Sequence, residues 1–386
     1  MRRVAVIGVG MTTFGKHQRS SGELFAEAAR EALADAEMTP SSIQALYYGN
    51  VTGGEGEKQL HTSPLAATLL GLTGVPTTRF ENACATSHTA FRHAVMEVAS
   101  GVSDVVLVGG AERVLHIPTD HATEYFAYCS DATWEQPLGL TFPGVFALIA
   151  RAHMDKYGTT EEQMAHVAVK NHRHGVHNPR AQFRKEISIE TVMKSAYVAD
   201  PLKLFDCCPF TDGGAALVLA SEDVARRARR PIWVLASAAA SDTMFMHEKG
   251  DLARVPATER AAQIAYRQAG LAPADVDVVE LHDCFTMAEI VATEGLGFFE
   301  PGTGGLAAEK GWTSIGGKIP VNPSGGLKSK GHPIGATGAA QIVEIATQLR
   351  RDAGPRQVDG AKVGLTHTLG GNTATVCVSL FASDRV

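Results

Sequence analysis

The sequence predicts an α/β protein built from two copies of one β-α-β-α-β unit, and three observations support this fold class. Residues 3–9 and 231–236 are continuous apolar runs, which are typical of strands buried on both faces. Helical periodicity and a further strand follow each run, and the copies align so that Ala28 matches Ala261 and Ala45 matches Val278. The 386 residues are 45% hydrophobic and include 39 glycines, which favours a large core of small residues.

In the first half, residues 84–100 have the apolar spacing of an alanine-rich helix that ends at Gly101. A strand is expected over 105–110. A second strand, over 217–220, closes this half of the chain.

The second half repeats the pattern. We expect strands over 276–281, 362–366 and 373–380, with a helix over 338–349. Such units predict mostly parallel strands with helices on both faces of the sheet. Small residues in the two central helices let the halves pack closely.

We expect three structural parts. Residues 1–115 together with 201–225 form the first half, and 226–386 form the second. Between them, 116–200 breaks the pattern into helices and loops, which predicts an inserted loop domain. Loops laid over a rigid scaffold usually carry binding function.

Composition excludes several function classes. The formal net charge is −6, which provides no basic field for nucleic acid or an anionic membrane. No apolar run reaches the roughly 18 residues of a membrane span, so we expect a cytoplasmic protein. Gly8 and Gly10 lack the third glycine of a dinucleotide fingerprint, which argues against a nicotinamide site.

Metal binding is not expected either. The six cysteines contain no Cys-x-x-Cys pair and should be thiols in the cytosol. His166, His172, His174 and His177 form a cluster in sequence, but no carboxylate or thiolate completes a clear ligand set.

Cys84 is the strongest candidate nucleophile. It lies in Glu-Asn-Ala-Cys-Ala-Thr-Ser-His, where the first central helix begins. Free backbone N–H groups and the positive end of the helix dipole stabilise a thiolate there, so we expect a lowered pKa.

Three histidines stand at equivalent places. His332 lies in a glycine-dense turn, Gly-His-Pro-Ile-Gly-Ala-Thr-Gly, and a histidine positioned there is a candidate base. His282 and Cys284 follow a strand in Leu-His-Asp-Cys-Phe, and His367 follows another. Strand ends are where ligands usually bind in open α/β sheets. We expect these residues to converge with Cys84 if a pseudo-twofold axis relates the halves.

The Asn-Ala-Cys-Ala-Thr, His-Asp-Cys-Phe and Gly-His-Pro-Ile-Gly-Ala-Thr-Gly segments together resemble the thiolases, in particular the sterol-carrier-protein-x type and its archaeal and bacterial relatives. The resemblance covers essentially the whole chain. It implies two duplicated β-α-β-α-β-β halves in a five-layered α-β-α-β-α core, with a loop domain over the active site. It also implies a homodimer formed through the first half, or a dimer of such dimers.

The resemblance implies residue roles as well. Cys84 would accept the acyl group, and His332 would deprotonate it and later help to hold a thioester oxygen. His282 would support an oxyanion hole in place of an asparagine found in most thiolases. Gly370 would supply a backbone contact. No covalently bound cofactor is implied, and coenzyme A would be substrate and product.

One departure concerns the acid/base. Most thiolases carry a second cysteine in a Cys-x-Gly-Gly-Gly segment, where this chain has His367-Thr368-Leu369-Gly370-Gly371. In the sterol-carrier type the cysteine of His-Asp-Cys-Phe is thought to replace it, so we assign general acid/base catalysis to Cys284. His367 stays a possible catalytic residue, and a Cys-His-His arrangement keeps decarboxylating condensation open as a lesser option.

We further expect Asn322, Ser324 and Lys330 of the glycine-rich turn to contact substrate or CoA, together with Arg184 of the basic loop over residues 171–184. A separately encoded zinc-ribbon and OB-fold protein that helps to bind acyl-CoA is a possible partner. The predicted activity is thiolytic cleavage of a 3-ketoacyl-CoA, or the reverse Claisen condensation. Two alternatives stay open: a retro-aldol lyase acting on a branched or steroid-type acyl-CoA, and a non-catalytic acyl-CoA or lipid carrier or assembly scaffold.

Overall fold

The computed structural model describes residues 2–383. The first half contains these elements: β1 (Val4–Met11), α1 (Ser21–Asp35), β2 (Ala45–Gly49), α2 (Thr62–Leu70), β3 (Thr77–Phe80), α3 (Thr86–Ser100), β4 (Val105–Glu112), β7 (Gly213–Ser221) and α8 (Glu222–Ala225). The second half contains these: β8 (Ile232–Ser241), α9 (Pro256–Ala269), β9 (Val278–Glu280), α10 (Thr286–Gly295), α11 (Gly304–Glu309), α12 (Gly326–Ser329), α13 (Thr337–Leu349), β10 (Val363–Gly370) and β11 (Thr375–Ala382).

The strands join in one sheet with the order β3-β2-β4-β7-β1-β8-β11-β10-β9. The first five strands belong to the first half and the last four to the second. The halves meet where β1 pairs with β8 at only two positions, Ala5 with Trp233 and Val6 with Ile232.

The expectation of mostly parallel strands is wrong. β2 runs parallel to β3 and β4, and β9 runs parallel to β10, but the pairs β1·β7, β4·β7, β1·β8, β8·β11 and β10·β11 are antiparallel. The reason is that β11 returns from β10 through a short turn, and β7 enters the sheet between β4 and β1 after the long insertion. Apolar composition reports burial on both faces and does not report strand direction.

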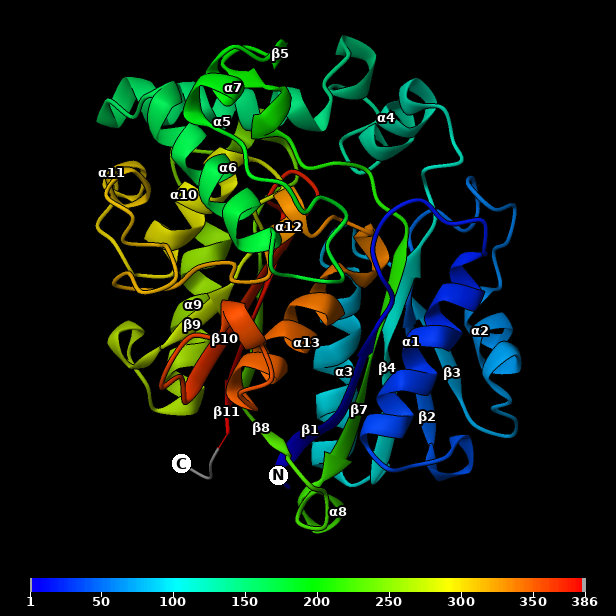
Figure 1. The fold of residues 1–386 in the computed structure, drawn as a ribbon. Helices are drawn as coiled ribbons and strands as arrows, with labels where there is room; N and C mark the ends of the chain where they lie inside the picture. Colours follow the sequence, from blue (N-terminus) through cyan, green and yellow to red (C-terminus); the bar gives the residue numbers. More distant parts are fainter. Residues whose placement is uncertain (1, 384–386) are drawn as a thin grey trace.

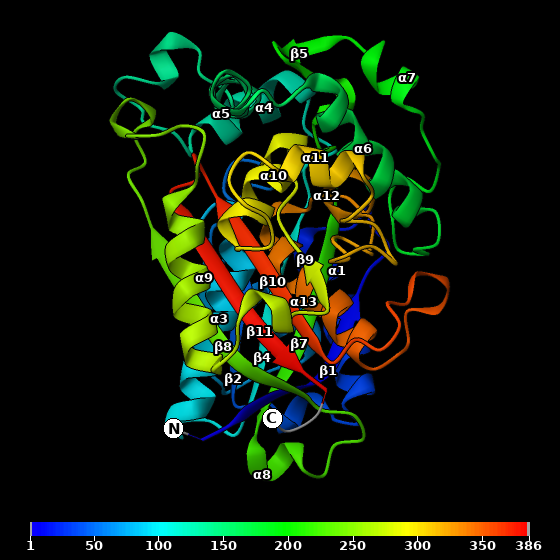
Figure 2. The same cartoon turned by 90° about the vertical axis from the view of Figure 1, so that its left-hand side faces the viewer.

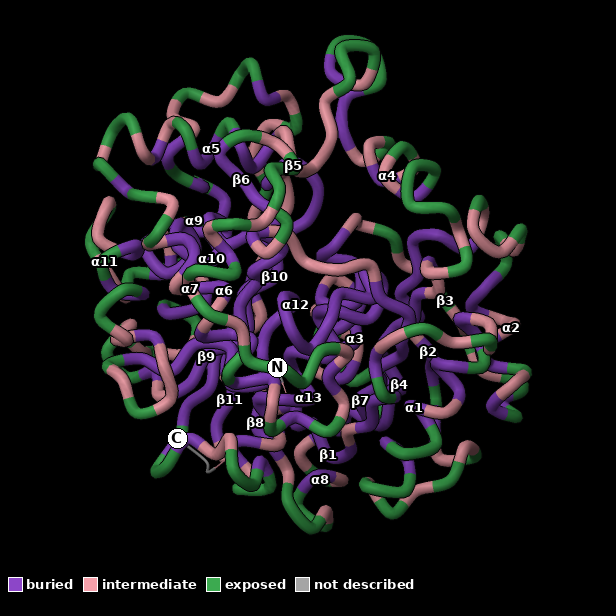
Figure 3. The backbone as a smooth tube through the Cα atoms, turned by 45° about the horizontal axis from the view of Figure 1, so that its top comes forward, coloured by how far each residue is buried: buried purple, intermediate pink, exposed green. Residues whose placement is uncertain are grey.

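The layers follow the expected five-layered order. α1 packs on the first-half strands from outside, and α9 packs on β8 and β11 from the other outside face (Figures 1 and 2). α3 and α13 pack against each other and lie between the two sheet halves. Figure 3 shows that the residues of α13 are nearly all buried, whereas α3 also carries half-buried and exposed residues such as Met96.

Small residues permit the close approach of α3 and α13. A Cβ atom on Gly338 of α13 would lie 2.6 Å from the Cβ of His88 on α3, so a larger residue would push the helices apart. Because Cys84 and His332 stand directly before these helices, their separation is fixed by this packing.

The segment between β4 and β7 contains α4 (Thr119–Ala127), α5 (Phe142–Tyr157), α6 (Glu161–Gly175), α7 (Ile189–Met193), and the short hairpin of β5 (Tyr197–Ala199) and β6 (Leu202–Lys203). It lies across one end of the sheet, at the top of Figure 1. In residues 2–383 no helix is both long and apolar enough to cross a membrane.

Candidate active site

Cys84 lies in a sharp turn between β3 and α3. The preceding residue, Ala83, has a φ of 46°, in the left-handed region that residues with a side chain rarely adopt. Ala85 then caps α3, so the Cys84 thiol stands at the start of that helix. Unusual backbone of this kind persists where surrounding structure enforces it, often at functional sites.

The structure brings Cys84, His282 and His332 together. The Cys84 Sγ and one ring nitrogen of each histidine lie within 4.8 Å of one another, and all three residues are buried. Within residues 2–383, no other three side chains of the types His, Cys, Asp and Glu bring their nitrogen, sulfur or carboxylate oxygen atoms this close together. The two imidazoles meet edge to face, with ring centroids 5.1 Å apart.

Thr337 sets the orientation and tautomer of His332. The Thr337 hydroxyl donates to the carbonyl of Pro333 at 3.1 Å, and its oxygen lies 2.6 Å from His332 Nδ1. Assigning the hydroxyl proton to the Pro333 carbonyl places the ring proton of His332 on Nδ1, which then donates to Thr337. His332 Nε2 is therefore the ring atom that can accept a proton.

Burial keeps both histidines neutral. It lowers the pKa of His332 from 6.5 to about 3, and it lowers the pKa of His282 well below 6.5, with the nearby His332 and His367 rings acting in the same direction. Neither ring nitrogen of His282 has a hydrogen-bond partner in the part of the chain described. A buried imidazole without a partner is available to donate to a substrate oxygen.

The pKa of Cys84 departs from the expected direction. Burial raises it well above 9.0, and the hydrogen bond from the Gly371 backbone N–H opposes this only partly. The helix start therefore does not by itself produce a thiolate. Burying the charged thiolate away from water costs more free energy than its interaction with the helix start gains. Deprotonation needs a base, and His332 lies beside the sulfur.

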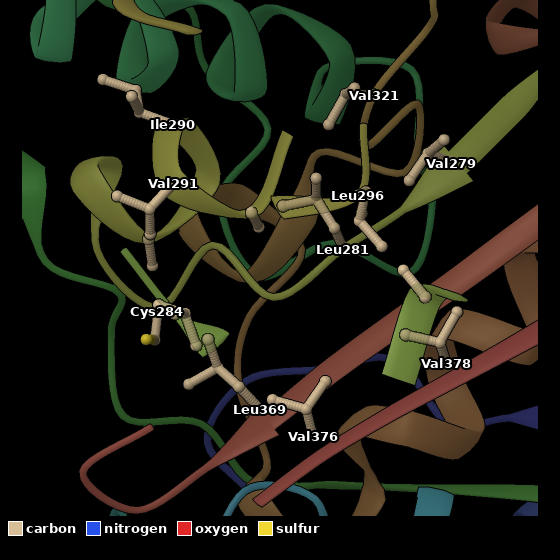
Figure 4. Packing of buried hydrophobic residues seen from close by; sticks show 14 of the residues in the cluster. Val279, Leu281, Cys284, Ile290, Val291, Leu296, Val321, Leu369, Val376 and Val378 are labelled. Atoms are coloured by element: carbon tan, nitrogen blue, oxygen red, sulfur yellow. The ribbon is translucent and has the colours of Figure 1, made fainter. Parts of the chain in front are cut away.

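Cys284 follows the end of β9 and is 6% exposed. Its carbonyl accepts a 2.8 Å hydrogen bond from the Cys208 backbone N–H. Figure 4 shows it at the edge of a buried apolar cluster that includes Val291 and Leu369. Burial raises its pKa well above 9.0, so the resting side chain is a thiol that can give a proton.

His367 stands outside the group of three. Its Nε2 lies 3.0 Å from Thr258 Oγ1, and burial lowers its pKa to about 3. Gly370, three residues later, packs against the Cys84 turn: a Cβ there would lie 2.6 Å from the Asn82 carbonyl oxygen. This contact brings the Gly371 N–H to the Cys84 sulfur.

Three residues predicted to contact substrate are fully buried and bonded within the protein. Ser324 Oγ donates to Glu280 at 2.7 Å, and Lys330 Nζ pairs with the same carboxylate at 3.1 Å. Asn322 accepts a hydrogen bond from the Leu281 N–H at 2.8 Å and donates to Glu289. These contacts fasten the turn that carries His332 to the strand end that carries His282.

Arg184, the fourth predicted contact, lies in the exposed basic loop, and its Nε donates to the Val176 carbonyl at 3.4 Å. His172 and His174 are not in a loop but are buried on α6, and they do not converge: His172 bonds the Lys185 carbonyl, and His174 bonds the Asn322 carbonyl.

Sequence reasoning missed Asp283, which separates His282 from Cys284. Its carboxylate accepts hydrogen bonds from the Leu327 N–H at 2.8 Å and the Asn171 side chain at 2.7 Å, linking the His282 loop to α12 and α6. Its place in the His-Asp-Cys-Phe segment was the available signal. Sequence reasoning also missed Glu112 at the end of β4. An acidic residue at the end of an otherwise apolar strand was the available signal.

A cavity of about 670 Å³ lies next to the site. The segment Cys207-Cys208-Pro209 forms one wall, and the backbone N–H of Cys208 donates a hydrogen bond to the backbone carbonyl of Cys284. The aromatic rings of Phe183 and Phe205 and the side chain of Lys328 form further parts of the lining. The cavity has the size of a small-molecule site.

Comparison with known proteins agrees with this geometry. A family model described as the thiolase N-terminal domain matches residues 4–223, and one described as thiolase C-terminal domain-like matches 238–383. An acetyl-CoA acetyltransferase of Methanothermobacter thermautotrophicus is 48% identical over 99% of this chain and 100% of its own length. Sterol carrier protein 2 of Bos taurus is 39% identical over 97% of this chain and 71% of its own length.

A solved structure described as the Ltp2-ChsH2(DUF35) aldolase superposes with a TM-score of 0.87 at 28% identity, over 99% of this chain and 98% of that chain. A monomeric SCP2-thiolase like protein type 1 from Mycobacterium smegmatis shares the fold, with a TM-score of 0.76 at 19% identity over 99% of this chain and 78% of that one. With both family models matched in order and a relative of nearly equal length, the chain belongs to the thiolase family.

Proposed function

We propose that this thiolase-type acyltransferase cleaves a 3-ketoacyl-CoA, or forms one in reverse, through an acyl group carried on Cys84. The observation that carries the proposal is the convergence of the Cys84 sulfur with the ring nitrogens of His282 and His332. A thiol, a neutral base and an unpartnered donor are the groups that acyl transfer requires.

In the first step His332 Nε2 takes the Cys84 proton, and the sulfur attacks C3 of the substrate. The bond between C2 and C3 breaks, and its electron pair moves onto the departing acyl-CoA as an enolate. His282 and the protonated His332 donate to the developing oxyanion. Cys284 gives its proton to C2, which releases acetyl-CoA, or a 2-substituted acyl-CoA when C2 carries a branch, and leaves the chain-shortened acyl group on Cys84.

In the second step the Cys284 thiolate takes the proton of the CoA thiol. The CoA sulfur then attacks the acyl group, and the Cys84 sulfur leaves and recovers its proton from His332. Every proton is returned, so the cycle needs no external acid or base. Protonation of a carbon by a positioned group contributes typically 10² to 10⁴ in rate.

The surrounding residues support this chemistry. Asn322, Ser324 and Lys330 position the His332 turn, because their side chains bond the buried carboxylates of Glu289 and Glu280. Residues 116–200 act as the loop domain that shapes the acyl-chain site, between a first half of 1–115 with 201–225 and a second half of 226–386. His367 affects the reaction indirectly, because its ring helps to lower the pKa of His282.

Two features of the assembly are part of the proposal. The chain forms a homodimer, or a dimer of dimers, through its first half. It also works with a small zinc-ribbon and OB-fold protein that helps to bind acyl-CoA, and the similarity to the structure described as Ltp2-ChsH2(DUF35) supports this. Equal thiolysis rates with and without such a partner would contradict the second point.

The same structure is described as an aldolase, which makes retro-aldol cleavage of a branched acyl-CoA the competing function. Product analysis separates the two. Thiolysis of a 3-ketoacyl-CoA consumes one CoA and yields two thioesters, whereas retro-aldol cleavage of a 3-hydroxyacyl-CoA yields one thioester and a free carbonyl compound. Chromatography after incubation with both substrate types should show thiolysis alone. A free ketone or aldehyde product, without CoA consumption, would favour the aldolase.

A further inference from the structure

Lys328 differs from the other lysines buried near the site. Lys170 Nζ lies 2.5 Å from Glu289, and Lys330 Nζ lies 3.1 Å from Glu280. The Lys328 side chain is only 2% exposed, yet its Nζ has no hydrogen-bond partner within residues 2–383. A buried amine without a partner in the protein is costly, and a ligand, an ion or a bound water can complete it.

Asp283, a buried carboxylate that interacts electrostatically with Lys328, does not complete it. Asp283 accepts from the Leu327 N–H at 2.8 Å, the Lys328 N–H at 3.4 Å and the Asn171 amide at 2.7 Å. It therefore bonds the backbone of Lys328 and not its amine, and Lys328 is also one of the residues that line the cavity.

That cavity shares a wall with the segment that contacts the Cys284 loop. One wall is the Cys207-Cys208-Pro209 segment, in which the Cys208 N–H bonds the Cys284 carbonyl and Cys207 forms a β-bridge with Phe285. Cys84, His282, Cys284 and His332 do not line the cavity, so a thioester with its acyl end at Cys84 would reach the cavity only by passing this wall. The rings of Phe183 and Phe205 supply apolar contact on the far side.

We propose that Lys328 is a substrate-binding residue that holds an anionic oxygen of the acyl-CoA within this cavity. The inference rests on the proposed function, which supplies the ligand class. Two parts of such a ligand carry anionic oxygens: the phosphates of CoA, and a carboxylate at the end of an acyl chain. Both are bound by lysine through charge-assisted hydrogen bonds.

The test measures binding without turnover, so that it is independent of the proposed reaction. Every protein carries Cys84→Ala, which keeps thioesters intact, and is compared with the same protein carrying Lys328→Met. Calorimetry then gives the affinity of CoA, of pantetheine, which lacks the phosphates, and of hexanoyl-CoA and adipyl-CoA, which differ by a terminal carboxylate. Lys194→Met removes a charge from an exposed lysine outside the cavity and serves as the matched control.

If Lys328 contacts a phosphate, Lys328→Met should lower the affinity for CoA about tenfold or more and leave the affinity for pantetheine unchanged. A carboxylate contact predicts a loss of the same size for adipyl-CoA alone. Affinities within about twofold for all four ligands, or an equal loss for CoA and pantetheine, would overturn the inference. Lys328-dependent CoA binding in a protein whose parent forms no acyl adduct would instead refute the proposed reaction and leave the binding role intact.

Discussion

The imidazole rings of His282 and His332 lie edge to face, with centroids 5.1 Å apart and an interplanar angle of 82°. One ring comes from the loop after β9, and the other from the turn that leads into α13. Because both are neutral at pH 7, they can share a small, dry volume with the Cys84 sulfur without repulsion. This arrangement gives one ring a base's role and leaves the other as a donor.

The His332–Thr337 hydrogen bond should matter for the chemical step. Thr337→Val removes the hydroxyl that fixes the ring proton on Nδ1, so both orientation and tautomer are lost. We expect the rate of Cys84 acylation to fall about 10-fold to 100-fold, as for loss of a hydrogen bond worth about 1.5–3 kcal/mol. Stopped-flow measurement of acyl-enzyme formation checks this. Thr337→Ser should restore most of the rate, and an unchanged rate in Thr337→Val would refute the orienting role.

When the acylation rate is measured against pH, its fall on the acid side should begin well below pH 6. The pKa of His332 is lowered from 6.5 to about 3, so the ring stays available as a base through the range in which an ordinary histidine is protonated. We expect single-turnover acylation to be nearly flat between pH 8 and about 5. A half-maximal rate near pH 6.5 would contradict a buried neutral base.

The same shift affects stability. In the unfolded chain the imidazole binds a proton below about 6.5, whereas in the folded protein it does so only near 3. The unfolded state therefore binds more protons in this window, and the contribution of His332 is lost as pH falls from 6.5 towards 3. The free energy of unfolding of His332→Asn should decline less steeply than that of the unaltered chain over pH 6.5 to 4.5. Parallel declines would show that His332 does not titrate in this way.

Cys284 and His367 should be separable by isotope exchange. If Cys284 moves the C2 proton, Cys284→Ala should slow thiolysis by at least about 100-fold. It should still acylate Cys84 from acetyl-CoA, because that step requires no proton at carbon. Hydrogen–deuterium exchange at C2 of acetyl-CoA in D₂O, followed by mass spectrometry, tests this directly. His367→Ala should retain the exchange, and loss of exchange in His367→Ala alone would reverse the assignment.

Glu112 should be a strong stability determinant. Its buried carboxylate accepts from the backbone N–H groups of Val51, Thr52 and Gly335 at 2.9–3.0 Å, and so ties β4 to the His332 turn. Glu112→Gln turns an amide donor towards these donors, and we expect the free energy of unfolding to fall by about 2–3 kcal/mol. Urea denaturation measures it. Glu190→Gln, at an exposed position, should change it by less than about 0.5 kcal/mol.

Much of this molecule could be predicted from its sequence because the signals are local. The apolar run before Gly8, the helix that ends at Gly101 and the duplication all report periodicity within short windows. The convergence of Cys84 with His332 was predictable from the duplication, because the two residues precede the matching helices α3 and α13.

The remainder depends on contacts between distant segments. The raised pKa of Cys84 comes from burial beneath elements far away in the chain, which the sequence around Cys84 does not report. Lys330 pairs with Glu280, whereas the amine of Lys328 has no partner within residues 2–383. This difference depends on which side chains the fold brings next to each lysine. Strand direction was mispredicted for the same reason, because β7 pairs with β1 from more than half the chain away.

The central claim is that Cys84 carries the acyl group, and mass spectrometry of the intact protein after incubation with acetyl-CoA and with a series of 3-ketoacyl-CoAs tests it most directly. The account predicts an acyl adduct that maps to the Cys84 peptide, is absent in Cys84→Ala, and disappears when CoA is added. An unmodified protein after incubation with every thioester, or an adduct that persists in Cys84→Ala, would contradict it.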